Sequence, residues 1–258
     1  MKQALNDFMT YFEFLKLLVR RDLKKKYYRS FFGVFWTMLN PLLLMILMTI
    51  IFSTIFKRQI DFYPIYWFCG HIIFEFVTSA SRLGMNAIIA NAGLIKKINV
   101  PTYFFVLSQV ILHFTTTIIS LIPFFAITFV LGVPFTPYML LTPIIFIFPF
   151  IFTLGLTLIT AAYGTSLRDL PHLYGIFTRL WMYATPIFYP IDIIPDSFRF
   201  LWDLNPLYIF IEMFRNIILD GQMPSEKFII IATVYSLLTL CMGITVFKEK
   251  KDSFLLYI

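Results

Sequence analysis

Four side chains between residues 174 and 185 have types and a spacing suited to contact with a sugar chain. They are Tyr174, Thr178, Trp181 and Thr185. Successive intervals of four, three and four residues place all four on one face of a helix. Aromatic rings stack on the apolar faces of pyranoses, and hydroxyl groups exchange hydrogen bonds with sugars, so weak repeated contacts would let a polymer move along. The alternative is that these rings sit at a lipid interface, where Trp and Tyr concentrate.

Trp36 and Asn40 form a second polar and aromatic pair. They share a helix face with Leu43 and Leu47, because these positions also recur at intervals of four, three and four residues. We expect this face to contact the same polymer. Trp36 lies near the end of an apolar stretch, so a position at the lipid interface explains it equally well.

Three ionisable side chains fall within apolar stretches: His71, Glu75 and Arg179. An acid at the centre of a bilayer costs about 2.5–3.5 kcal/mol on insertion scales, so such a residue points to function or to a polar partner. His71 precedes Glu75 by one helical turn, and the two are expected to share a hydrogen bond. We expect the three residues at a subunit seam or a transport path. The alternatives are a structural polar pair, a proton relay, and snorkelling of Arg179 to an interface.

A polar segment between residues 82 and 102 separates two of the apolar stretches. Asn91 and Gly93 disfavour a continuous helix, and Pro101 closes the segment. Leucine and isoleucine between polar flanks predict a short knob that inserts into a groove of a partner protein. A solvated turn whose lysines set the topology is the alternative. The residues expected at the contact are Asn91, Gly93, Leu94, Ile95, Lys96 and Lys97.

These residues must be positioned by helices that lie in a membrane. The chain has 258 residues, of which 59% are hydrophobic and 14% are charged, with a mean hydropathy of +0.82. Soluble proteins average about 25% charged residues, so this composition excludes a soluble globule, a disordered chain and a nucleic-acid module. Cys69 and Cys241 both fall in apolar runs and are interpreted as small hydrophobic residues.

The apolar stretches predict one all-α transmembrane domain over residues 1–258. Continuous runs without ten-residue alternation favour helices over a barrel. Residues 1–32 are expected to form an amphipathic helix at the membrane interface, followed by a basic stretch that contacts lipid headgroups. Residues 190–227 are too apolar for a free external loop and predict two short re-entrant helices, with an interfacial cap that does not gate as the alternative. Residues 248–258 form a tail. The six predicted spans are residues 33–56, 62–81, 103–131, 138–163, 171–189 and 228–247.

The basic residues predict which side each end occupies. An even number of spans places both termini on one side, and 15 of the Lys and Arg residues then fall on that side, against five on the other. Arg179 lies within a span. The positive-inside rule therefore predicts that both termini are cytoplasmic. The formal charge of +7 is interpreted as this topology signal, and we expect no nucleic acid as a partner.

Three segments together resemble the membrane subunit of type-2 ABC exporters of polysaccharides, a family that includes exporters of O-antigen, teichoic acid and capsule. The first is Arg21-Asp22 followed by Gly33, Trp36 and Asn40-Pro41. The second is the segment from Asn91 to Val100-Pro101. The third comprises Arg168-Asp169, Thr185-Pro186, Asn205-Pro206-Leu207 and Arg215. The likeness covers nearly the whole chain, with the segments in the family's order.

The resemblance implies a homodimer with two copies of a separate ATP-binding subunit, in the bacterial inner (plasma) membrane. This assembly would carry lipid-linked polysaccharide from the cytoplasmic to the outer face. It further implies that the first and fifth spans line the path, that residues 91–101 lie near the ATPase, and that Asn205, Pro206 and Arg215 belong to an outer gate. The sequence has no G-x-x-x-x-G-K-[ST] motif, so ATP and magnesium are expected on the partner. We expect no catalytic residue, cofactor or metal in this chain.

Two other functions remain as alternatives. A membrane glycosyltransferase that acts on lipid-linked sugar would need an acidic cluster near the cytoplasmic face, whereas the acids predicted there are scattered. An ABC permease for small drugs would share the fold. The amphipathic N-terminus, the short loops and the aromatic fifth span favour a polymer.

Overall fold

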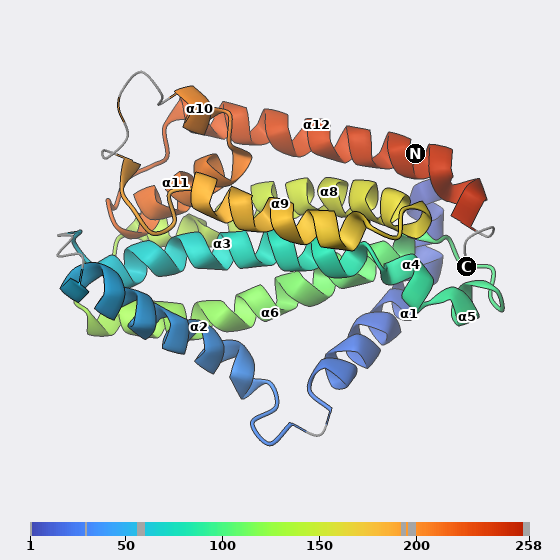
Figure 1. Cartoon of the computed structure of the whole chain (residues 1–258), viewed down its shortest axis with the longest axis horizontal. Helices are drawn as coiled ribbons and strands as arrows, with labels where there is room; N and C mark the ends of the chain where they lie inside the picture. The colour runs from blue at the N-terminus through green and yellow to red at the C-terminus, as the bar shows by residue number, and fades with distance from the viewer. Residues whose placement is uncertain (1, 29, 56–59, 192–194, 196–199, 255–258) are drawn as a thin grey trace.

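Long apolar helices run side by side along the longest dimension of the molecule (Figure 1). The computed structural model describes residues 2–28, 30–55, 60–191, 195 and 200–254. Throughout these residues the chain is helix or loop, with no strand, in agreement with the predicted all-α class. The parts of the predicted first span and external segment at residues 56, 192–194 and 196–199 lie outside the described residues.

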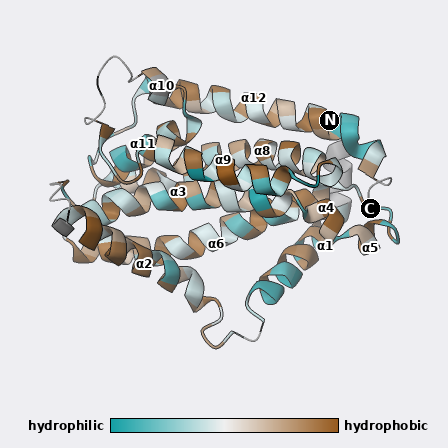
Figure 2. Cartoon of the chain, viewed as in Figure 1, coloured by the Kyte–Doolittle hydropathy of each residue, from teal (hydrophilic) through white to brown (hydrophobic). Residues whose placement is uncertain are grey.

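The N-terminal half of the chain contains the N-terminal helix α1 followed by α2, α3 and α6, with two one-turn helices before α6. α1 contains both polar and apolar residues, and its last turn carries three lysines (Figure 2). α2 continues into a π-helical turn, which is a rare form of helix. The elements are α1 (Lys2–Lys26), α2 (Phe35–Thr49), the π-helix Ile50–Ile55, α3 (Tyr63–Gly84), α4 (Ala87–Ala90), α5 (Ala92–Ile95) and α6 (Tyr103–Val130).

The C-terminal half contains two helices of 20 and 25 residues, α8 and α12, separated by shorter ones. The fourth predicted span is divided, because a 3₁₀ turn and a one-turn helix precede its long helix. The elements are the 3₁₀ helix Pro137–Leu141, α7 (Thr142–Ile145), α8 (Ile147–Ser166), α9 (Leu170–Ala184), α10 (Phe200–Asp203), α11 (Pro206–Ile218), α12 (Glu226–Lys250) and the 3₁₀ helix Lys251–Ser253.

Four helical segments among the described residues are long and apolar enough to cross a membrane. The helices of the predicted second and fifth spans, α3 and α9, are not among them. α3 is long enough, with 22 residues, but its most apolar stretch is more polar than those of the four segments. α9 has 15 residues, or about 22 Å at 1.5 Å per residue. The count of six spans stays a prediction. The four segments are Phe35–Ser53, Tyr103–Val130, Pro137–Ser166 and Glu226–Ser253.

The predicted fifth span is wrong at its C-terminal end. α9 ends at Ala184, and Thr185 has an extended backbone with φ −105° and ψ 131°. Thr185 precedes Pro186, and a residue before proline is disfavoured in the helical conformation. Thr185 is therefore at the end of the helix and not on its face.

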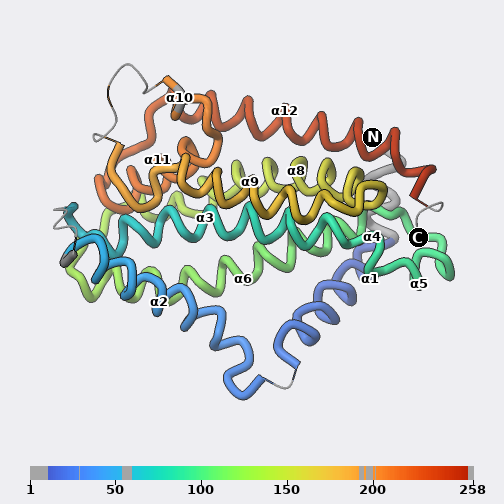
Figure 3. Tube along the Cα trace, in the orientation of Figure 1, coloured from blue at the N-terminus to red at the C-terminus, as the bar shows by residue number. Residues whose placement is uncertain are grey.

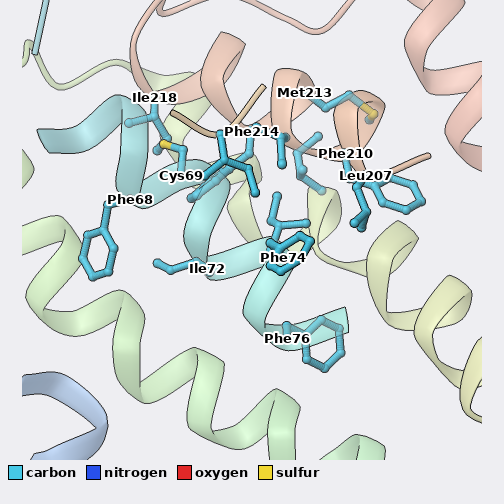
Figure 4. Close-up of a cluster of buried hydrophobic side chains, with 14 of the residues drawn as sticks. Phe68, Cys69, Ile72, Phe74, Phe76, Leu207, Phe210, Met213, Phe214 and Ile218 are labelled. Atoms are coloured by element: carbon cyan, nitrogen blue, oxygen red, sulfur yellow. The ribbon is translucent and has the colours of Figure 1, made fainter. Parts of the chain in front are cut away.

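α3 and α11 form the centre of the larger hydrophobic core. Cys69 of α3 lies toward Phe214 and Ile218 of α11 in Figure 4, and all three side chains are buried. Phe68 points to the other side of α3, where its ring centroid lies 5.4 Å from that of Phe124 of α6. A second buried cluster includes Leu18 of α1, Phe105 of α6 and Phe247 of α12. The end of α12 lies at the same end of the molecule as α4 and α5 (Figure 3).

Two glycines allow α8 and α12 to approach closely. A Cβ atom on Gly155 would lie 2.3 Å from the carbonyl oxygen of Thr239, and one on Gly243 would lie 2.4 Å from the carbonyl oxygen of Gly155. Small residues at such a crossing let helix backbones pack directly, which drives helix association where lipid surrounds the protein.

Candidate functional site

A cavity of about 460 Å³ lies between the end of α1 and the helices α2, α3 and α6. It brings together four residues that the sequence predicted from two separate stretches: Trp36 and Asn40 of α2, and His71 and Glu75 of α3. Hydroxyl-bearing residues of α6 (Thr116, Thr117 and Ser120) also line it. The cavity is a polar space among otherwise apolar helices.

The predicted hydrogen bond between His71 and Glu75 is absent from the described part of the chain. Ser79 Oγ donates to the Glu75 carboxylate instead, and the His71 ring stacks on Trp67 at 4.5 Å between centroids. His71 and Glu75 therefore each contact a side chain one turn away on α3 instead of each other. Glu75 also borders a smaller cavity of about 150 Å³, which Arg179 of α9 lines. Glu75 and Arg179 therefore share a site, whereas His71 faces only the larger cavity.

Sequence reasoning missed His113 on α6, which lines the larger cavity. Its side chain is buried, and within the described residues its Nε2 atom has no hydrogen-bond partner. Lys26 and Arg82 also line this cavity. The one feature of the sequence that could have pointed to this residue is that His113 is an isolated histidine in a long run without formal charges. Only tertiary packing brings it to the other polar groups.

The predicted sugar-binding face of α9 faces the interior of the chain. The Tyr174 hydroxyl is hydrogen-bonded to Ser81 Oγ of α3, and the Thr178 hydroxyl donates to the Tyr174 carbonyl at 2.9 Å. Tyr174 is buried, as is Thr185. The opposite face of α9 is exposed and mostly apolar, with Leu173, Ile176, Phe177, Leu180 and Tyr183.

Trp181 and Thr185 meet Asn205, a residue predicted in the outer gate. Trp181 Nε1 donates to Asn205 Oδ1 at 2.9 Å, and Asn205 Nδ2 donates to Thr185 Oγ1 at 2.9 Å. Asn205 is also the N-cap of α11, since its Oδ1 accepts from the Leu207 N–H at 3.1 Å. Pro206 follows at the first helical position, where a missing N–H is harmless. One amide thus joins the end of α9 to the start of α11.

Arg215 is a buried anchor with 3% of its surface exposed. Its Nη1 donates to Glu212 Oε1 at 2.8 Å, and its Nη2 donates to the Tyr66 carbonyl at 3.3 Å. The guanidinium also lies over the Tyr66 ring, 3.5 Å from the centroid. These contacts fix α11 on α3.

The predicted coupling segment is joined to α1. Arg21 Nη2 donates to Asn91 Oδ1 at 2.9 Å, and the Tyr11 hydroxyl donates to the Asn99 carbonyl at 3.1 Å. Asn91 is buried and separates α4 from α5, as expected from a break in the helix. Leu94 and Ile95 are half-buried against the cluster around Leu18. Gly93, Lys96 and Lys97 are exposed.

Comparison with known proteins shows the family to which this chain belongs. Residues 13–219 match the ABC-2 type transporter family. The chain is 32% identical over 247 residues to an O-antigen export system permease protein RfbA from Klebsiella pneumoniae, covering 94% of each chain. It is 29% identical over 243 residues to RfbA from Myxococcus xanthus, covering 92% of each. It is 22% identical over 247 residues to the polysialic acid transport protein KpsM from Escherichia coli. The chain belongs to the ABC-2 type transporter family of membrane proteins.

Proposed function

We propose that this chain is the membrane subunit of an ATP-driven exporter, which moves lipid-linked polysaccharide from the cytoplasmic to the outer face of a bacterial inner membrane. The observation that carries the proposal is similarity over 94% of both chains to a permease named for O-antigen export. In this proposal α3 and α9 complete the six spans, and α10 and α11 form the re-entrant region on the outer side.

Two exposed helix faces support a homodimer with the polymer path at its seam. Trp36, Leu43 and Leu47 are exposed on α2, and Phe177 and Tyr183 are exposed on α9. Both helices belong to spans that would line the path. On this view Trp36 and Asn40 contact the polymer directly, together with the exposed rings of α9. The inward residues Tyr174, Thr178 and Thr185 act indirectly, because they hold α9 in position.

A chain of hydrogen bonds offers a route from the ATPase to the path. Residues 91–101 are tied to α1 through Arg21 and Tyr11. The Tyr27 hydroxyl, just after α1, is hydrogen-bonded to Thr37 Oγ1 of α2. A push on the coupling segment therefore moves α1 and the start of α2 together. The Trp181–Asn205 contact would then carry motion of α9 to α11 and the outer gate.

ATP hydrolysis by the reconstituted complex tests this function. The chain is purified with the ATP-binding subunit that accompanies it, placed in lipid vesicles, and supplied with lipid-linked polysaccharide. We expect the polymer to raise the rate of ATP hydrolysis. Indifference to polymer together with stimulation by small amphipathic drugs would favour a drug permease. Sugar transfer by the isolated chain would favour a glycosyltransferase.

A further inference from the structure

Two cations and a buried imidazole meet in the cavity between α1, α2, α3 and α6. Lys26 and Arg82 line it, and neither forms an ion pair with Glu75 in the described part of the chain. Lys26, Arg82, Glu75 and His113 all line this one cavity. The formal charges of Lys26, Arg82 and Glu75 sum to one net positive charge in the cavity.

His113 contributes a buried imidazole to the lining of this cavity. Its side chain is 6% exposed, and its Nε2 atom is buried without a hydrogen-bond partner within the described residues. A buried polar atom without a partner is costly, so such atoms usually meet a ligand or water. A neutral imidazole protonated on Nε2 would donate a hydrogen bond to an anionic oxygen.

An exposed aromatic cluster adjoins the polar cavity. Phe32 contacts Phe31, Phe35 and Trp36 at ring-centroid distances of 5.0, 6.2 and 5.4 Å. Phe31 is 94% exposed, and Trp36 both joins this cluster and lines the cavity. The cationic cavity suits the polar headgroup of an amphiphile, and the exposed rings beside it suit the hydrocarbon chain.

We propose that the cavity binds the phosphate or diphosphate headgroup of a lipid, whose hydrocarbon chain lies over the Phe31–Trp36 rings. Lys26 and Arg82 would pair with phosphate oxygens, which form strong charge-assisted hydrogen bonds, and His113 Nε2–H would donate a further one. The lipid is either the carrier of the exported glycan, in which case the site rests on the proposed function, or a membrane phospholipid. The cavity of about 460 Å³ has room for such a headgroup.

Binding of geranylgeranyl diphosphate to the purified full-length chain in detergent tests the site. We expect saturable binding measured by microscale thermophoresis, and an affinity about ten-fold weaker in Lys26→Gln and in Arg82→Gln, since each removes one charge-assisted contact. His113→Phe should also weaken binding, whereas His113→Gln, which restores a donor, should recover part of it. Glu75→Gln should bind at least as tightly, because it removes a like charge.

The controls separate the site from general attraction to lipid. Lys248→Gln changes an exposed lysine of α12 outside the cavity and should bind as the native chain does. Equal competition by phosphatidic acid would identify a phospholipid as the occupant, and selectivity for the diphosphate would identify the glycan carrier; both outcomes support the site. Equally tight binding of geranylgeraniol, or of inorganic diphosphate, would contradict it. So would an unchanged affinity in a folded Lys26→Gln/Arg82→Gln variant.

Discussion

Trp181 Nε1 donates a 2.9 Å hydrogen bond to Asn205 Oδ1, which links α9 to the first turn of α11. Asn205 serves two further partners, the Thr185 hydroxyl and the Leu207 N–H. A residue predicted to contact polymer and a residue predicted to gate the outer side therefore belong to one hydrogen-bonded cluster. The end of α9 and the start of α11 are therefore joined by side-chain hydrogen bonds.

Replacing Asn205 should destabilise the chain more than replacing its indole partner. Trp181→Phe keeps the ring and loses one hydrogen bond, worth about 1 kcal/mol. Asn205→Ala loses that bond, the bond to Thr185 and an N-cap worth about another 1 kcal/mol. Thermal unfolding in detergent measures both, with exposed Tyr138→Phe as the control. Equal melting temperatures for the two variants would contradict the shared role of Asn205.

Arg215→Met should be strongly destabilising, by about 3–5 kcal/mol, because it leaves the partly buried Glu212 without its ion-pair partner. Arg215→Lys should give an intermediate loss, since lysine cannot stack on Tyr66 and donate to several acceptors at once. The matched control is Lys227→Gln, which breaks the exposed pair with Asp203 and should cost about 0–1 kcal/mol. Similar losses for Arg215→Met and Lys227→Gln would show that Arg215 is not an anchor.

Gly155→Ala should prevent the native packing of α8 against α12. The added Cβ atom would meet backbone atoms of Thr239 and Leu240 at 2.3–2.5 Å, and backbone cannot move aside as a flexible side chain can. Gly175→Ala on α9 meets nothing within 4 Å and should be neutral or stabilising by about 0.5–1 kcal/mol. Yield of monodisperse protein after detergent extraction distinguishes the two. A Gly155→Ala chain as stable as the native one would rule out this close crossing.

Gly93→Pro should uncouple ATP hydrolysis from export while the chain stays in the membrane. Proline at position 93 disfavours the helical conformation of Ala92, so α5 would open beside the contact between Arg21 and Asn91. Gly93→Ala is the control, because its Cβ would meet nothing within 4 Å. The readouts are membrane content, polymer-stimulated hydrolysis and surface polymer. Normal export by Gly93→Pro would remove the coupling role from this segment.

The sequence predicted the long helices well, because uncharged runs bounded by charges, glycine and proline mark them directly. α6 and α12 begin and end close to the expected residues, and the break at Asn91 was found. The end of α9 was missed although Pro186 signalled it. Helix ends depend on local features such as this proline, and these can be identified in the sequence.

The orientation of α9 could not be predicted in the same way. Tyr174 and Thr178 face other helices of the chain, whereas Leu180 on the opposite face of α9 is exposed. The spacing of residues shows which of them share a helix face, but it does not show what that face packs against. The cavity that joins Glu75 to His113 also depends on packing between distant segments, and no periodic pattern announces it.

Surface polysaccharide in cells that lack this chain tests its proposed role most directly. Without the chain, we predict that lipid-linked polymer accumulates on the cytoplasmic side and disappears from the surface. Expression of the chain from a plasmid should restore surface polymer, whereas a partner lacking ATP hydrolysis should prevent the restoration. Normal surface polymer in the deletion strain, with no intracellular accumulation, would contradict the proposed function.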